Sequence, residues 1–162
     1  MRTFLLATSL ILITVGCKTT APSFNEVAQI TKVKNTIDRF YKNINKQHLQ
    51  DSKKVFAEDT SLIFLGTHDG EFFKGTKAVH NMIENALAFK EKANVTVAIK
   101  EQYITIHRSG MVAWFSQVTD WRIDIKGNII FLKDLRVSGV LEKKKDEWLF
   151  VQYHSSLPEK RK

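Results

Sequence analysis

The chain has 162 residues, one cysteine and a formal net charge of +8, from 25 Lys and Arg against 17 Asp and Glu. This length fits a single domain that can bury a core without disulfides or structural metals. Hydrophobic residues make up 43% and charged residues 26% of the chain, which are ordinary globular values and exclude wholesale disorder. The single cysteine excludes an intramolecular disulfide and a thiolate-rich metal site.

The N-terminal segment has the pattern of an export signal. Met1-Arg2 gives a positive start, and residues 3–16 carry no charge. As a helix this apolar run would span about 21 Å, less than the bilayer core of about 30 Å, which favours a secretory signal over a membrane span. We therefore expect residues 1–17 to be a signal peptide and residues 18–25 to be a polar tether.

The signal ends at Thr14-Val15-Gly16-Cys17, which resembles a bacterial lipobox, although Thr14 stands where the motif usually has an aliphatic residue. The resemblance implies that Cys17 receives lipid and becomes the mature N-terminus. Ordinary cleavage nearby and an uncleaved anchor are the alternatives. On the lipobox interpretation the protein is exported and anchored in the bacterial cell envelope, facing the periplasm or the cell surface.

Basic runs at 143–145 and in the tail 159–162 supply much of the positive charge. We interpret them as a solvated turn and a solvated tail, and attraction to anionic lipid headgroups is the alternative. The sequence has no recognised nucleic-acid-binding motif, so nucleic acid is not an expected partner.

Hydrophobic periodicity divides the mature chain into helices first and long strands afterwards. Apolar residues three or four positions apart predict an amphipathic helix over 24–46. Further elements are expected at 51–57 (short helix), 61–66 and 71–75 (short strands), 76–89 (helix), and 95–108, 111–125, 129–144 and 147–156 (long strands). Two-residue turns are predicted at Ser109-Gly110, Gly127-Asn128 and Lys145-Asp146. This pattern indicates an α+β domain over residues 26–158, with helices on one face of a curved sheet.

The element order resembles the NTF2-like cone fold, and specifically its SnoaL-like branch. The residues that carry the resemblance are 64–67, Gly75, 112–115, 136–143 and 148–156. The resemblance implies a curved antiparallel or mixed sheet with three N-terminal helices packed on its concave face around a pocket. It also implies a homodimer through the outer face of the sheet. It does not specify an activity, because relatives include polyketide cyclases, steroid isomerases, dehydratases and assembly domains.

The predicted turns determine which residues share a face, since directly opposed residues of antiparallel strands point to the same side. They place Tyr103, Ser116, Gly139 and Gln152 in one row across the four long strands. The next row holds Glu101, Val118, Val137 and His154, with Asp120 one row beyond, and a further row holds Trp114, Leu141 and Phe150. Because this last row is rich in core-like side chains, we assign this face to the pocket.

On this assignment the pocket holds six ligand-binding candidates: Tyr41 from the first helix, Tyr103, Trp114, Ser116, Gly139 and Gln152. His154 is the leading catalytic candidate because its unperturbed pKa lies near neutrality. Asp120 or Glu101 is its candidate carboxylate partner for acid and base chemistry. A structural role for each of these side chains is the alternative, and a register error of one residue would move them to the other face.

The five histidines fall on different predicted elements, so no metal site is expected. No cofactor is expected either, because the sequence has no glycine-rich phosphate loop. The favoured function is the binding of a small, mostly apolar molecule in the cone. The alternatives are an acid/base enzyme of the isomerase, cyclase or lyase type, and a non-catalytic dimerisation or assembly module.

Overall fold

The computed structural model describes residues 24–46, 48–90 and 93–159. The elements, in chain order, are α1 (Glu26–Lys46), α2 (Leu49–Lys53), β1 (Ile63–Leu65), β2 (Phe72–Lys74), α3 (Thr76–Lys90), β3 (Ala93–Ile106), β4 (Val112–Ile125), β5 (Asn128–Lys144) and β6 (Glu147–Ser156). The expected signal peptide with Cys17, the tether up to residue 23, and residues 160–162 of the basic tail lie outside the described residues. The predicted order of helices and strands is confirmed.

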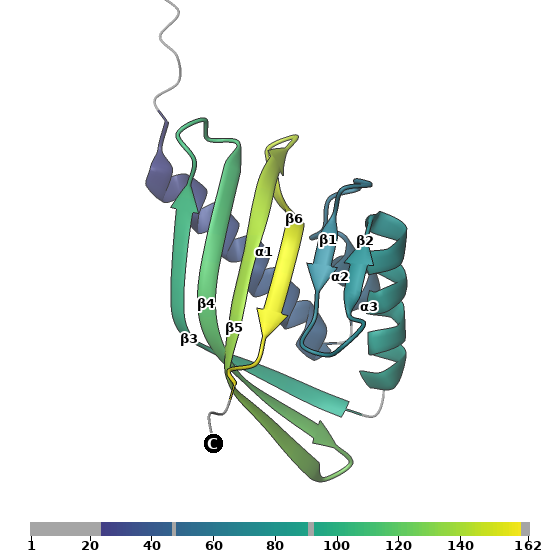
Figure 1. The fold of residues 1–162 in the computed structure, drawn as a ribbon. Helices are drawn as coiled ribbons and strands as arrows, with labels where there is room; N and C mark the ends of the chain where they lie inside the picture. Colours follow the sequence, from purple (N-terminus) through teal and green to yellow (C-terminus); the bar gives the residue numbers. More distant parts are fainter. Residues whose placement is uncertain (1–23, 47, 91–92, 160–162) are drawn as a thin grey trace, which may run out of the picture.

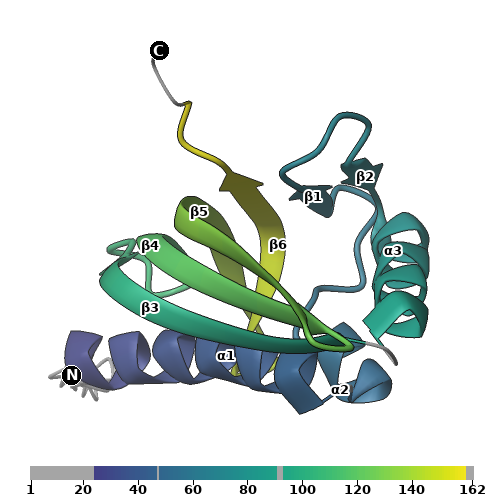
Figure 2. The same ribbon diagram turned by 90° about the horizontal axis from the view of Figure 1, so that it is seen from below.

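The first helix, α1, is amphipathic and buries one side against the sheet. It begins after Asn25, whose side-chain Oδ1 accepts a hydrogen bond from the Ala28 N–H at 3.0 Å, as N-capping residues do. Its buried apolar side chains are Val33, Ile37, Phe40, Tyr41 and Ile44. The helix crosses the sheet on a diagonal (Figure 1), and the long strands curve over it (Figure 2).

The second helix, α2, is shorter than predicted and begins earlier. The sequence predicts a helix over 51–57, whereas α2 covers Leu49–Lys53. The chain leaves the helix there, and Val55, Phe56 and Ala57 enter the core, where Phe56 forms a parallel β-bridge with Phe150. Burial of this apolar segment outweighs its local helix propensity.

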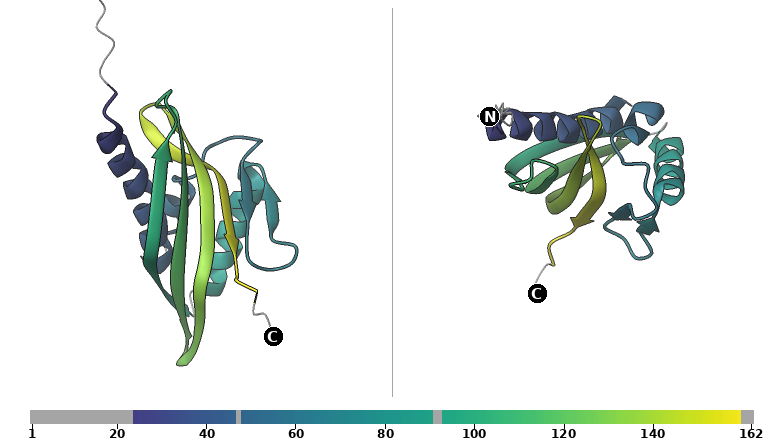
Figure 3. Two further views of the ribbon diagram at one scale, coloured as in Figure 1. Left: turned by 60° about the vertical axis from the view of Figure 1, so that its left-hand side comes forward. Right: turned by 90° about the horizontal axis from the view of Figure 1, so that it is seen from above.

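All six strands form one sheet in the order β2-β1-β6-β5-β4-β3, with β1 parallel to β6 and every other pair antiparallel. The predicted curved, mixed sheet is therefore confirmed. On the four long strands α1 covers one face, the inner face, and no described helix covers the opposite, outer face (Figures 2 and 3). No helix among the described residues is both long and apolar enough to cross a bilayer.

The register is as predicted in the first long hairpin and differs in the second. Tyr103 pairs with Ser116, as expected from the Ser109-Gly110 turn. In the β4–β5 hairpin the turn falls at Lys126-Gly127, both with positive φ, instead of Gly127-Asn128. A bulge then places both Lys133 and Asp134 opposite Asp120, and Asp134 also has a positive φ.

The earlier turn shifts the pairing of β5 with β4 by two residues. By itself this shift would keep every side chain of β5 on its predicted face. The bulge adds one residue, so Ser116 pairs with Ser138 and Phe115 pairs with Gly139. The predicted pairing of Ser116 with Gly139 is therefore wrong by one residue. A one-residue slip exchanges the faces, and Gly139 and Val137 point to the inner face while Tyr103 and Ser116 point to the outer face.

A second bulge changes the register of the last hairpin. Next to the Lys145-Asp146 turn, Leu141 pairs with Phe150 as predicted. The register then shifts, because Val151 is an extra residue in β6, and Gly139 pairs with Tyr153 instead of Gln152. Gln152 and His154 consequently leave the inner face, and Tyr153 enters it.

Candidate functional site

A cavity of about 250 Å³ lies between the inner face of the sheet, α3 and the connection from β1 to β2. Most of its wall is apolar: Phe40 and Ile44 of α1, Phe64 of β1, Met82, Ile83 and Ala86 of α3, and Trp121, Ile123, Leu132 and Leu135 of β4 and β5. The polar side chains in the wall are Ser52, Thr67, His68, Glu71, Tyr153 and Ser155. An apolar cavity with a few polar groups is the usual form of a small-molecule site.

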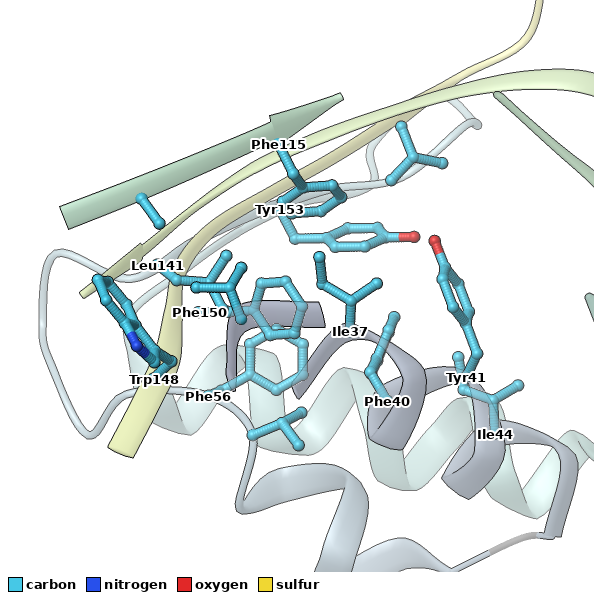
Figure 4. Packing of buried hydrophobic residues seen from close by; sticks show 14 of the residues in the cluster. Ile37, Phe40, Tyr41, Ile44, Phe56, Phe115, Leu141, Trp148, Phe150 and Tyr153 are labelled. Atoms are coloured by element: carbon cyan, nitrogen blue, oxygen red, sulfur yellow. The ribbon is translucent and has the colours of Figure 1, made fainter. Parts of the chain in front are cut away.

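Aromatic side chains support the cavity from the core side. The Phe64 ring stacks on the Tyr153 ring with centroids 4.8 Å apart, and Phe40 packs edge-on to Tyr153 at 5.2 Å. Phe56 and Phe150 continue this cluster deeper into the core (Figure 4). The tight packing holds the Tyr153 ring in one position, so its hydroxyl is fixed relative to the cavity.

Two buried tyrosines and a buried glutamine form a hydrogen-bonded group on the inner face. The Gln117 amide Nε2 donates to the Tyr41 hydroxyl oxygen, and the Tyr41 and Tyr153 hydroxyls point toward each other and share a hydrogen bond (Figure 4). Burial raises the pKa of both hydroxyls above the ordinary value, so both stay protonated at neutral pH. Tyr41 was expected at the pocket, whereas Gln117 and Tyr153 were not.

The loop between β1 and β2 forms a polar rim. Glu71 Oε2 accepts a hydrogen bond from the His68 backbone N–H at 2.9 Å and lies 3.4 Å from His68 Nδ1. The Glu71 side chain folds over Gly66, where a methyl group would collide with its carboxylate. The rim therefore brings an imidazole and a carboxylate together beside the cavity, with both side chains open to solvent.

Most of the residues that the sequence proposes for the pocket lie elsewhere. Tyr103 and Trp114 stand on the outer face with 69% and 44% of their surface exposed. Ser116, Gln152 and His154 share that face, because of the two bulges. Their predicted place in the inner cavity is therefore wrong, although Tyr103, Ser116 and His154 do line one hollow on the outer face. Their functional roles stay predictions.

Gly139 does lie on the inner face, but it does not open space for a ligand. A Cβ atom at this position would lie 2.5 Å from a Phe115 ring carbon and 2.6 Å from the Gln152 carbonyl oxygen. The glycine therefore makes room for the Phe115 ring within the core, and Phe115 is 2% exposed.

The three proposed catalytic residues are only partly brought together. Glu101 and His154 both line an open hollow on the outer face, together with Tyr103, Arg136 and Ser138. Asp120 stands at the β5 bulge, where its Oδ1 accepts the Asp134 N–H at 2.9 Å and its Oδ2 lies 3.9 Å from Lys100 Nζ. None of these carboxylates or the imidazole lines the inner cavity. Across the described ranges, no three His, Cys, Asp or Glu side chains are gathered as a metal-binding group.

The cavity residues left out of the sequence prediction had a detectable signal. Trp148, Phe150 and Tyr153 are all buried, and the step of three from Phe150 to Tyr153 breaks the alternation of a regular strand. The same break occurs between Leu132 and Leu135. Each break marks a bulge, and reading it would have placed Tyr153 inside.

Comparisons with known proteins identify the family and the fold. A family model of the SnoaL-like domain matches residues 33–160. No curated protein matches the sequence. Among solved structures, a proposed dehydratase of the NTF2-like family from Streptomyces avermitilis superposes with a TM-score of 0.72 at 8% identity, covering 84% of this chain and 100% of that chain.

Two further structures have the same fold. A proposed calcium/calmodulin-dependent protein kinase II association domain from Xanthomonas campestris has a TM-score of 0.68 at 18% identity, covering 86% of this chain and 93% of that chain. An NTF2-like protein with a cystatin-like fold from Novosphingobium aromaticivorans has a TM-score of 0.68 at 12% identity, covering 83% and 85%. At such identities the likeness shows the fold alone. With the family model matching most of its length, the chain belongs to the SnoaL-like family and has the NTF2-like α+β fold.

Proposed function

We propose that this domain binds a small, mostly apolar molecule in its inner cavity. The observation that supports this proposal is the apolar cavity of about 250 Å³ between the sheet, α3 and the β1–β2 loop. A pair of buried tyrosine hydroxyls lies beside it. The cavity is slightly smaller than the roughly 300–1,000 Å³ typical of drug-sized ligands. A molecule of one or two rings fits it better than a larger one.

The cavity favours binding over acid/base catalysis by the residues that the sequence suggests. His154, Asp120 and Glu101 stand outside it, so a molecule held in the cavity has no contact with them. Chemistry by these three side chains would require a second site on the outer face.

Thermal unfolding with a panel of small acids, sterols, aromatics and sugars tests the proposal. A ligand present at 100 times its dissociation constant adds about 2.7 kcal/mol to the free energy of unfolding. Ala86→Trp fills the cavity from α3 and should abolish the shift, whereas Asn85→Trp, on the exposed side of the same helix, should preserve it. A panel without any stabilising compound, or a shift that survives Ala86→Trp, would contradict the proposal.

We also propose a homodimer through the outer face. Tyr103 and Trp114 are diagonal neighbours on β3 and β4 and are largely exposed, and aromatic side chains are enriched in the cores of protein interfaces. Sedimentation should show a dimer that Tyr103→Glu and Trp114→Glu dissociate. Phe72→Glu changes an equally exposed aromatic on β2 and should leave the dimer intact. A monomeric wild-type protein would rule the dimer out.

The third part of the proposal concerns location. The apolar run at 3–16 and the lipobox-like end at Cys17 support an exported protein anchored by lipid in the cell envelope. Metabolic labelling with a fatty-acid analogue should mark the wild type in the membrane fraction, and Cys17→Ser should lose the label. Absence of the label from the wild type would point to ordinary cleavage or an uncleaved anchor.

A further inference from the structure

The apolar stripe of α1 continues beyond the part of the helix that the sheet covers. Val33 is fully buried and Ile30 is partly buried against the core, whereas Val27 is 74% exposed. Residues three or four positions apart lie on the same side of a helix, so Val27 belongs to the same stripe as Ile30. The first turn of α1 therefore presents apolar surface to its surroundings.

Two further exposed apolar side chains lie at this end of the molecule. The Phe24 ring lies against Gly110 in the connection between β3 and β4, where a Cβ atom would come within 2.8 Å of a ring carbon. Met111 follows Gly110, and both Phe24 and Met111 are about half exposed. The start of α1 and the β3–β4 connection share one end of the sheet (Figure 1). We call Phe24, Val27 and Met111 the apolar patch.

Charge contributes little beside the apolar patch, because lysines around the β5–β6 turn at the same end have acidic partners. Lys143 Nζ lies 2.8 Å from Asp146 Oδ1, and Lys32 Nζ lies 3.0 Å from Oδ2 of the same residue. Lys144 Nζ lies 3.1 Å from Asp59 Oδ2. These pairs neutralise much of the basic turn, so the chemistry that distinguishes this end is apolar.

The length of chain before the apolar patch limits what can cover it. Seven residues separate Phe24 from Cys17, the expected site of lipid attachment. A fully extended chain spans at most about 3.6 Å per residue. On the proposed location, Phe24 therefore stays within about 25 Å of the bilayer that holds the lipid. The β4–β5 hairpin, in contrast, lies at the opposite end of the sheet (Figure 1).

Resting on the proposed location, we propose that the apolar patch docks the domain on the bilayer in which its lipid is anchored. Apolar side chains of helices at a membrane surface enter the boundary between headgroups and acyl chains, to a depth of about 5–10 Å. Phe24, Val27 and Met111 occupy this boundary, and the β4–β5 hairpin points away from the membrane. The lipid thus holds the chain at the membrane, and the apolar patch sets the orientation of the domain.

Spin labels measure this contact without changing the anchor. The chain has one cysteine, Cys17, whose thiol carries the lipid on the proposed location, so a cysteine introduced elsewhere is the single free thiol. The full chain with Val27→Cys or Met111→Cys is expressed with its own signal, labelled with a nitroxide and reconstituted into vesicles of phosphatidylethanolamine and phosphatidylglycerol. Electron paramagnetic resonance should show both labels more accessible to oxygen, which concentrates in the bilayer, than to a water-soluble nickel chelate. A label at Phe131→Cys, an exposed position near the opposite hairpin, should show the reverse.

A second substitution then assigns the contact to the apolar side chains. Val27→Glu should move the label at Met111→Cys into water while the protein stays in the membrane fraction. The variant should fold, because an acidic residue is favourable in the first turn of a helix and Val27 is largely exposed. Phe131→Glu is the matched control and should leave the label in the bilayer. Salt at about 1 M, where the Debye length is about 3 Å, should leave it there too.

The outcomes separate this inference from the proposed location. Labels at both patch positions in water, in a protein that carries lipid, would overturn the docking and leave the anchor intact. Release of the label by salt would also overturn it, because the contact would then depend on charge. Spectral broadening that disappears on dilution with unlabelled protein would show a second copy against the patch instead of lipid. A wild-type chain without lipid would overturn the proposed location and this inference together.

Discussion

The inner and outer faces of the four long strands are built from alternating residues of the same chain, yet their chemistry differs sharply. On the inner face, polar groups are few and mostly paired: Gln117 and Thr119 are buried among aromatic and aliphatic side chains. On the outer face, large aromatics such as Tyr103 and Trp114 are exposed beside unburied polar and charged groups. Composition along a strand therefore does not reveal which face is the interior, because both faces mix apolar and polar residues.

What separates the faces is packing against α1. Tyr41 and Phe40 come from this helix and contact β4 and β6 side chains of the inner face. Polar groups there cannot reach water and must find partners within the protein. Neighbouring residues of one strand thus give matched pairs of substitutions, one buried and one exposed, that measure the difference directly.

The largest difference is expected for Phe115 and Trp114, which are adjacent on β4. Phe115→Ala removes a ring that is 2% exposed and should lower the free energy of unfolding by about 3–5 kcal/mol. Trp114→Ala removes a ring that is 44% exposed and should cost about 1 kcal/mol or less in the monomer. Urea unfolding at a protein concentration that keeps the chain monomeric gives both values. Equal losses would mean that the assignment of faces is wrong.

The next comparison adds atoms instead of removing them. Gly139→Ala places a methyl group against the Phe115 ring and the Gln152 carbonyl and should destabilise the protein by about 1–3 kcal/mol. Ser138→Ala, one residue earlier on the outer face, should stay within about 0.5 kcal/mol of the wild type. Thermal unfolding of both variants provides the measurement. A Gly139→Ala variant as stable as the wild type would indicate that the core around Phe115 can rearrange at little cost in free energy.

A polar pair on β4 extends the comparison to hydrogen bonding. Gln117→Met keeps the length of the side chain but removes the donor to Tyr41 and the acceptor for Gln102, and the loss should be about 1–3 kcal/mol because buried groups lose their partners. Ser116→Ala on the outer face should have little effect. Urea unfolding of the two variants is the test, and a Gln117→Met protein as stable as the wild type would show that these hydrogen bonds contribute no stability.

Much of this fold could be predicted from the sequence because periodicity and turn residues determine it locally. The four long strands, α1 and α3 follow from spacing alone, and the Lys145-Asp146 turn sets the start of the last hairpin correctly. The register of β5 could not be obtained this way. Lys126 takes a positive φ in its turn, a conformation more typical of Gly, Asn or Asp, and the bulge at Asp134 moves the rest of the strand by one residue.

The site was harder to predict than the fold because it depends on every register at once. Tyr41 lies on the inner side as expected, since helical spacing does not change with strand register, but it does not line the cavity. Gln152 and His154 were placed inside and lie outside, because the bulge at Val151 separates them from Phe150, which lies inside as predicted. The cavity wall also depends on the path of the β1–β2 loop. Contacts such as that of Glu71 with Gly66 determine this path, and no local sequence pattern predicts them.

The smallest expected effect concerns a polar contact at the surface, where a pH dependence replaces a packing loss. Asp59 Oδ1 accepts hydrogen bonds from the Ser61 N–H at 2.9 Å and hydroxyl at 2.8 Å, and Lys144 Nζ donates to Oδ2 at 3.1 Å. These contacts, the Ser61 backbone bond foremost, lower the pKa of Asp59 to about 2.

Because the folded state favours the ionised carboxylate, its stabilisation is fully present above the unfolded pKa of about 3.9 and disappears as the pH falls through the folded pKa. Asp59→Asn should therefore be slightly less stable than the wild type at pH 7. Its deficit should shrink between about pH 4 and pH 2. Urea midpoints of both proteins measured from pH 7 down to pH 2 follow this change. Since the carboxylate lies at the solvent-exposed surface, the deficit at neutral pH should be smaller than that of any inner-face variant. A deficit that does not depend on pH would mean that Asp59 acts through its shape and its neutral hydrogen bonds, and that its charge adds nothing at this edge of the molecule.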